Sequence, residues 1–279
     1  MFYQNKYSKL KKMKRIMKKK NNVLSTLMMF MGIMSMVMLT SCGGADMDDN
    51  SYADPANGHE YVDLGLSVKW ATCNIGANNP WEYGDYFAWG ETNKKNYYDW
   101  TTYKWCNGTD NSLTKYNDTS EYGVVDNKKQ LELNDDAAHV NWGGAWRMPT
   151  DENRQELYAN CYCEWTNNYK NTNVKGFIFY KVKNNNDKGK MKFPNGGDNP
   201  SEYYTTTSDT HIFLPAAGAM VASDGLWEVG IQGNYYTSKG YGQDANGIWF
   251  RNEPQYATMM TLGGISPRCY GCSVRPVIP

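Results

Sequence analysis

The sequence predicts a single α+β domain with more strand than helix and with long, ordered loops. Residues 42–279 contain 36 Phe, Trp and Tyr side chains, including all ten Trp, whereas Leu and Ile are sparse. Asn and Gly interrupt the chain at short intervals. Aromatic residues favour strands, and Gly and Asn favour turns, so this composition indicates short strands joined by loops that aromatic packing holds in place. It does not fit a helical bundle.

One helix is well signalled, at residues 151–160. Thr150 follows Pro149 and is placed to cap the helix, and Asp151 and Glu152 fill the first turn, where the helix dipole favours acids.

Strands are expected on both sides of this helix. A hairpin is predicted over residues 176–193, with strands at 177–180 and 191–193 flanking a turn at 184–189. Other short runs of aromatic and β-branched residues predict strands at residues 61–64, 67–71, 212–214, 227–231, 247–251 and 273–277.

The N-terminal 41 residues are expected to be a lipoprotein signal peptide. Residues 23–39 form an almost continuous apolar run after a Lys/Arg-rich stretch, which is typical of an export signal and short for a membrane-spanning helix of about 20 residues. The run ends in residues 39–42 (LTSC), which resemble the lipobox of bacterial lipoproteins. That resemblance implies that Cys42 is diacylated and becomes the first mature residue. An uncleaved anchor and ordinary secretory cleavage are the alternatives.

Two features flank this signal. The basic region is long, and Met17 opens a more typical start, so Met1 and Met17 are both candidate starts. Residues 43–49 (GGADMDD) resemble the surface-export signal of Bacteroidota lipoproteins, which implies an outer-membrane protein on the cell surface, with a periplasm-facing protein as the alternative. Residues 42–58 are small and acidic and indicate a flexible tether, and we expect the domain itself to span residues 59–279.

Charge excludes several classes of function. The chain has 29 basic and 29 acidic residues, but nine of the basic ones lie in residues 1–41, which contain no acid. Residues 42–279 therefore hold 20 basic and 29 acidic side chains, a net charge of −9. This charge argues against a nucleic-acid binder and against electrostatic adhesion to anionic membranes, so membrane contact is expected through the lipid on Cys42. A single long apolar run also excludes a polytopic membrane protein.

Five ordered motifs carry a family resemblance. They are residues 60–71 (EYVDLGLSVKWA), 84–91 (GDYFAWGE), 141–150 (NWGGAWRMPT), 213–218 (FLPAAG) and 271–277 (GCSVRPV). Together they resemble the Fibrobacter succinogenes major paralogous (FISUMP) domain of exported Bacteroidota proteins. That family is similar in turn to the formylglycine-generating-enzyme-like group of C-type-lectin-like folds. The resemblance implies a fold and carries little about function.

These motifs indicate structural roles for several residues. Gly143 and Gly144 permit a tight turn that aims Trp146 inward. Arg147 and Arg275 are expected to be partly buried cations that tie loops to carboxylates or backbone carbonyls.

Six cysteines remain after Cys42. An even number in an exported chain favours disulfides, with fifteen possible pairings. A four-thiolate zinc site is the alternative for the two close pairs, although we expect no metal or cofactor. The disulfide candidates are Cys73, Cys106, Cys161, Cys163, Cys269 and Cys272.

Other candidates for chemistry are weaker. Cys269 and Cys272 lie where formylglycine-generating enzymes carry redox cysteines, although the spacing departs from theirs. Residues 253–255 (EPQ) resemble the sugar-specificity loop of calcium-dependent lectins, for which an ordinary turn is favoured. Residues 134–136 with His139 offer metal-ligand types without calcium-loop spacing, which favours a solvated loop or helix cap. The histidines His59, His139 and His211 form no catalytic pattern.

Aromatic side chains provide the best indication of binding. Most are expected to be buried, and a few exposed rings would stack on sugars or anchor a protein partner. They crowd one stretch, at Trp81, Tyr83, Tyr86, Trp89, Tyr97, Tyr98, Trp100, Tyr103 and Trp105. With no catalytic constellation, the sequence favours a lipid-anchored envelope protein with a non-catalytic, adhesion-type domain that binds a glycan or a protein. A formylglycine-generating-enzyme-like oxidoreductase and a structural component of a surface appendage are the alternatives.

Overall fold

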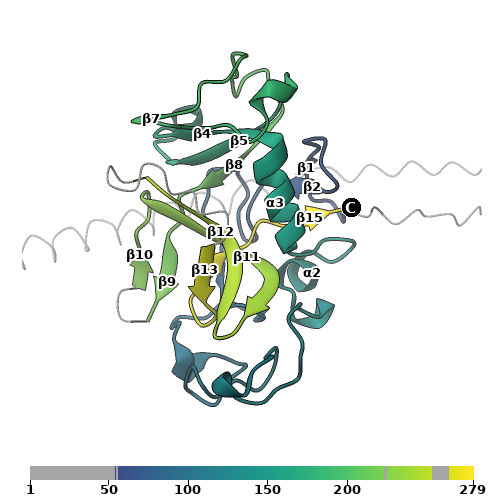
Figure 1. Ribbon diagram of the computed structural model, residues 1–279, viewed down its shortest axis with the longest axis vertical. Coiled ribbons are helices and arrows are strands. Elements are labelled where there is room, and N and C mark those ends of the chain that lie inside the picture. The colour runs from purple at the N-terminus through teal and green to yellow at the C-terminus, as the bar shows by residue number, and fades with distance from the viewer. Residues whose placement is uncertain (1–53, 55, 223–224, 253–263) are drawn as a thin grey trace, which may run out of the picture. The chain divides into compact units, whose positions relative to one another are not determined.

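The computed structural model describes residues 54, 56–222, 225–252 and 264–279 (Figure 1). Fifteen strands and two α-helices lie in this part of the chain, which confirms the strand-rich α+β prediction. No helix within these residues is long and apolar enough to cross a bilayer. Cys42, the predicted signal peptide and residues 253–255 lie outside the described residues.

One five-stranded sheet has the order β7-β6-β4-β5-β8. The strand β4 pairs antiparallel to β5 and parallel to β6, so the predicted hairpin between residues 177–180 and 191–193 is wrong although both strands exist. The reason is that β4 lies between these two strands in the sheet. The sequence did not predict β4, which begins directly after the helix that ends at Asn160. The bounds are β4 Cys161–Thr166, β5 Gly176–Lys181, β6 Met191–Phe193, β7 Gly196–Gly197 and β8 His211–Pro215.

A second five-stranded sheet has the order β13-β12-β11-β14-β3. Its longest strand, β11 (Gln232–Tyr241), is polar in sequence yet buried over nearly its whole length. Buried polar groups there are bonded, since the hydroxyl of Ser238 donates to the Pro149 carbonyl and that of Thr237 to the Asn246 carbonyl. The remaining bounds are β3 Tyr86–Phe87, β12 Asp244–Arg251, β13 Gly264–Pro267 and β14 Cys272–Ser273.

Two small sheets complete the strand arrangement. In the first, β2 (Lys69–Ala71) pairs with both β1 (Tyr61–Val62) and the C-terminal β15 (Val277–Ile278), so the first and last strands of the domain lie together. The second joins β9 (Ala219–Val221) to β10 (Gly225–Trp227).

Two strand predictions need correction. Residues 228–231 form a turn, because Glu228 and Gly230 adopt φ values of 56° and 76°, which a strand does not allow. Residues 273–277 form no continuous strand, since Ser273 ends β14 and Val277 begins β15 in a different sheet.

The helix α3 (Asp151–Asn160) has the predicted bounds and the predicted cap. The Thr150 hydroxyl accepts from the Asn153 backbone N–H, while the Asn153 side chain accepts from the Thr150 N–H, a reciprocal pair that satisfies two free donors. A shorter helix, α2 (Ala137–Trp142), is capped by Asp136.

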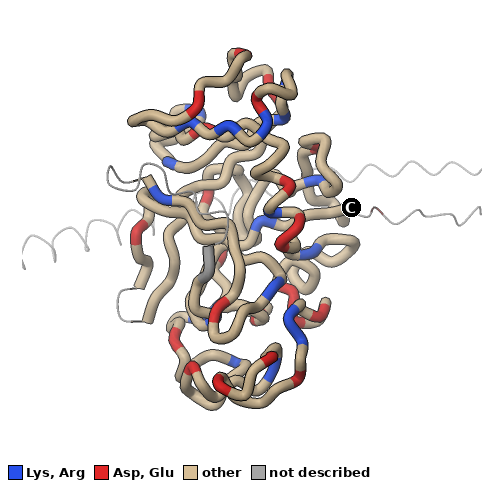
Figure 2. Tube along the Cα trace, in the orientation of Figure 1, with Lys and Arg blue, Asp and Glu red and all other residues tan. Residues whose placement is uncertain are grey.

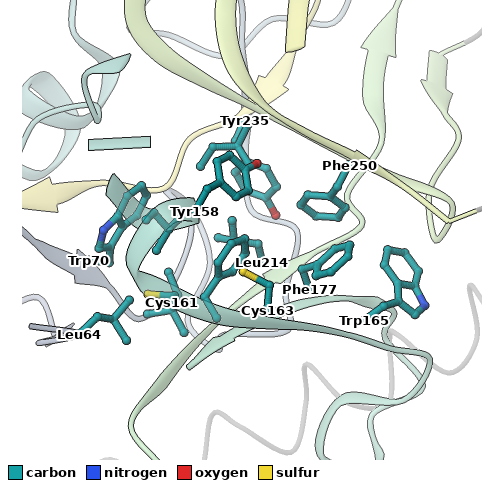
Figure 3. Close-up of a cluster of buried hydrophobic side chains, with 14 of the residues drawn as sticks. Leu64, Trp70, Tyr158, Cys161, Cys163, Trp165, Phe177, Leu214, Tyr235 and Phe250 are labelled. Atoms are coloured by element: carbon teal, nitrogen blue, oxygen red, sulfur yellow. The ribbon is translucent and has the colours of Figure 1, made fainter. Parts of the chain in front are cut away.

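One of the two main apolar clusters lies between α3 and the strands around it. Figure 3 shows aromatic rings from several strands, among them Trp70, Trp165, Phe177 and Phe250, gathered with Tyr158 of α3. All five are at most 5% exposed. Aromatic rings therefore supply the packing that Leu and Ile supply in most domains, as the composition predicts.

Candidate functional site

Arg275 is fully buried and serves to join distant segments. Its guanidinium donates to the Asn74 side-chain oxygen at 2.8 Å and to the carbonyls of Ala71 and Thr72 at 3.0 and 2.8 Å. A fourth bond, of 2.9 Å, reaches the carbonyl of Phe213 in β8. These bonds confirm the expected structural role of Arg275. The side chain is fully buried, whereas the sequence predicted partial burial, because all of its acceptors lie inside the domain.

The turn before α3 is likewise structural. Gly143 and Gly144 adopt φ values of 67° and 57°, and Trp146 is buried, with its indole N–H donating to the Ala56 carbonyl at 2.7 Å. The half-buried Arg147 donates from one nitrogen to the Met148 carbonyl and to the Asn153 side chain, both at 3.0 Å. These contacts leave neither the indole nor that guanidinium nitrogen free to bind a ligand.

The six cysteines all carry free thiols in the structure. Cys161 and Cys163 lie in the cluster of Figure 3, whereas Cys269 and Cys272 lie in two other clusters. The two close pairs therefore do not converge on a four-thiolate zinc site. The disulfide pairings stay a prediction.

Burial also keeps the thiols of Cys161, Cys269 and Cys272 protonated. It raises the pKa of Cys269 and of Cys272 to about 12, and Cys161 is affected in the same way. A reactive or copper-binding cysteine needs the thiolate, which a low pKa favours. The pair at Cys269 and Cys272 therefore lacks the electrostatic setting that redox chemistry would require.

The acidic run before α2 forms caps and bridges. Asp136 accepts from the backbone N–H groups of Ala138 and Met148, both at 2.8 Å, and Asp135 accepts from the Tyr116 hydroxyl at 2.7 Å. The predicted helix cap is confirmed at Asp136. Across the described ranges, no group of three or more His, Cys, Asp or Glu side chains is placed to hold a metal ion.

A small polar hollow of about 230 Å³ opens beside β1 and β2. His59 stacks on Trp142 there with ring centroids 3.9 Å apart, and burial lowers the pKa of His59, so the ring is neutral at neutral pH. Cys73 and Glu60 also line the hollow, but no hydrogen bond joins either of these side chains to the imidazole among the described contacts. The hollow brings together a thiol, an imidazole and a carboxylate without the contacts of a catalytic relay.

A larger and mostly apolar hollow of about 490 Å³ lies between the end of α3 and β6. Gln155, Tyr158, Ala159, Gly189 and Met191 line it. Its volume is within the range of small-molecule sites. The Tyr158 hydroxyl does not serve as a polar anchor there, because it is buried out of solvent contact and has no hydrogen-bond partner in the part of the chain that the structure describes.

The crowded aromatic stretch is mostly inside the fold. Tyr97 is its one exposed ring, at 48%, and the other eight are buried or half-buried. Several form structural bonds, such as the Trp89 indole N–H to the Thr237 carbonyl and the Tyr103 hydroxyl to the Trp89 carbonyl. The predicted preference for burial therefore holds, and this stretch supplies little binding surface.

Another pair of rings, one half-buried and one exposed, lies elsewhere, and the sequence did not single it out. Tyr122 contacts the turn between β11 and β12, since a Cβ added to Gly242 would lie 2.8 Å from the Tyr122 ring. Tyr241, which precedes that glycine, is 67% exposed. We call Tyr122 and Tyr241, with the adjoining Glu121, Asp110 and Asp244, the tyrosine surface. Its two rings come from segments about 120 residues apart, and only the fold brings them together.

No family model, curated protein or solved structure matches this chain. The FISUMP and lectin-like resemblances therefore stay predictions from the motifs.

Proposed function

We propose that this protein is a lipid-anchored envelope protein whose single domain binds a glycan or a protein at the cell surface and performs no chemistry. The observation that carries the proposal is the tyrosine surface, where an accessible aromatic ring lies beside carboxylates. Exposed tyrosine supplies contact area at a low entropic cost, and carboxylates add hydrogen-bond acceptors for hydroxyl or amino groups.

The side chains that the sequence offered for chemistry support the same proposal. Arg275 and Asp136 make structural hydrogen bonds inside the fold, and Cys269 and Cys272 are buried thiols of raised pKa. The oxidoreductase alternative requires a reactive thiol at this last pair, so it is disfavoured.

The anchor is tested by metabolic labelling with an alkyne fatty acid. Cells expressing the full chain should incorporate the label, and Cys42→Ala should lose it. Cys73→Ala is the matched control and should keep it, because this cysteine lies within the domain. Label that survives Cys42→Ala would refute lipidation at that residue.

Surface placement is tested by protease treatment of intact cells. A displayed domain should be degraded, whereas complete protection would leave the periplasm-facing alternative. Stable co-purification with a large assembly would instead favour the structural component of an appendage.

Binding is tested on glycan and host-protein arrays with the detergent-solubilised full chain, with and without Ca²⁺. We expect a ligand whose signal falls in Tyr122→Ala/Tyr241→Ala and persists in Tyr203→Ala, a ring that is 84% exposed on another loop. If no glycan or protein on either array gave a binding signal, the binding proposal would be contradicted.

A further inference from the structure

The tyrosine surface combines aromatic rings with unneutralised negative charge. Glu121 directly precedes Tyr122, and Asp244 pairs with Tyr241 across the β11–β12 turn. The charge of Glu121 is the largest cause that raises the pKa of Tyr122, and Asp244 and Asp110 add to it, so all three carboxylates act on this ring.

Three lysines of the neighbouring loops form ion pairs with other carboxylates. Lys115 pairs with Asp135 and Lys129 with Asp118, each at 2.6 Å, and Lys128 pairs with Glu132. None of the ion pairs within the described residues uses Asp110, Glu121 or Asp244. Asp244 is half-buried beside the guanidinium of Arg268, so Glu121 and Asp110 supply most of the accessible charge.

The surrounding sequence has the same sign. Residues 107–126 contain four acids (Asp110, Asp118, Glu121 and Asp126) against the single base Lys115, a net charge of −3. Figure 2 shows that charged residues gather in the loops at both ends of the view, whereas the central strands are mostly uncharged.

We propose that the tyrosine surface binds a cationic peptide, a Lys/Arg-rich segment of another protein. The proposal rests on the binding function proposed above and narrows its ligand class. Aromatic faces attract ammonium and guanidinium groups, and carboxylates at their edge pair with the same groups. An anionic polymer would be repelled, and a neutral glycan could only donate hydrogen bonds from its hydroxyls to the carboxylates, without the attraction between opposite charges. The acidic domain would also speed the encounter with a basic partner.

The test uses fluorescein-labelled octa-arginine and octa-lysine with the full chain in neutral detergent, with anisotropy as the readout. We expect saturable binding at 50 mM NaCl that weakens at least fivefold at 300 mM NaCl, because exposed charges are screened. Octa-glutamate and a neutral oligosaccharide such as cellohexaose should not bind.

Paired variants distinguish a specific surface from general attraction to an acidic protein. Glu121→Gln/Tyr122→Ala should weaken octa-arginine binding about three- to tenfold, as expected for one exposed ion pair and one cation–π contact. Glu202→Gln/Tyr203→Ala is the matched control, since it removes the same two groups from another exposed loop. Should Tyr122→Ala disturb folding, as judged by circular dichroism, Glu121→Gln/Asp110→Asn tests the charge alone.

The proposal would be overturned if the variant and the control lost equal affinity for octa-arginine. It would also be overturned if Glu121→Gln/Asp110→Asn left that affinity unchanged. Binding of cellohexaose that depends on Tyr122 and Tyr241 and ignores salt would identify a glycan surface and also overturn it. In that case, or if an array ligand depends on these rings while the peptides do not bind, the proposed binding function stands. If no ligand of any kind binds, both proposals fail.

Discussion

Replacing Arg275 by lysine tests whether this buried cation holds the domain together. The guanidinium has four hydrogen bonds of 2.8 to 3.0 Å to acceptors in three places: the end of β2, the Asn74 loop and β8. A lysine ammonium keeps the charge but places all its donors at one point. It cannot reach three separate groups of acceptors, so at least two acceptors lose their donor.

The magnitude follows from those lost bonds. A hydrogen bond to a charged group contributes about 1.5–3 kcal/mol, and a buried acceptor left unpaired costs about 1–3 kcal/mol. Arg275→Lys should therefore lower the free energy of unfolding by about 3–6 kcal/mol. That is a large share of the roughly 5–15 kcal/mol typical of a domain.

Urea unfolding followed by tryptophan fluorescence measures the effect. We expect the midpoint to fall by at least about 1 M with an unchanged slope. Arg147→Lys is the control. A single nitrogen of the half-buried Arg147 donates to both the Met148 carbonyl and the Asn153 side chain, so an ammonium can replace it at a cost of about 1 kcal/mol or less. If Arg275→Lys costs no more than Arg147→Lys, the joining role assigned to Arg275 is wrong.

Two further predictions concern other buried polar groups. The Tyr158 hydroxyl has no hydrogen-bond partner among the described residues, whereas that of Tyr235 donates to the Pro215 carbonyl at 2.6 Å. Tyr158→Phe should therefore leave the melting temperature unchanged or higher, and Tyr235→Phe should lower the free energy of unfolding by about 1–2 kcal/mol. Equal losses would contradict this contrast. Burial raises the pKa of Asp187, but hydrogen bonds from Ser201 and Tyr204 outweigh burial, so the pKa in the folded protein lies below the unfolded value of 3.8. The ionised Asp187 therefore stabilises the fold above pH 3.8, and this stabilisation is lost as the pH falls below that value. Asp187→Asn should therefore reduce the urea midpoint at pH 7 and flatten its decline below pH 4; parallel pH profiles would refute this.

Local signals predicted the helix well. The Thr150 cap and the acids of the first turn depend only on neighbouring residues, and α3 has the bounds that they indicate. The same holds for the left-handed glycines Gly143 and Gly144, because a tight turn is a local requirement.

Pairing between strands was much harder to predict. Nothing in residues 177–180 or 191–193 reveals that β4 lies between them, because β4 begins where α3 ends and has no turn residue to mark its start. The strand β11 was missed because its polar side chains find partners in other segments, which composition cannot show.

The tyrosine surface was beyond sequence reasoning for a similar cause. Tyr122 and Tyr241 stand apart in the chain, whereas the crowded aromatic stretch is conspicuous and largely buried. Aromatic density along a sequence indicates core as readily as surface, and only burial separates the two.

The pairing of β2 with β15 constrains the order in which parts of this domain can fold. Lys69 and Trp70 pair with residues 277–278, and Arg275 joins the same region to β8, so these contacts cannot form before residues 275–278 have left the ribosome. Contacts between distant parts of a chain also form slowly. The edge of the domain formed by β1, β2 and β15 is therefore expected to form late in folding, after the sheets whose strands are closer together in the sequence.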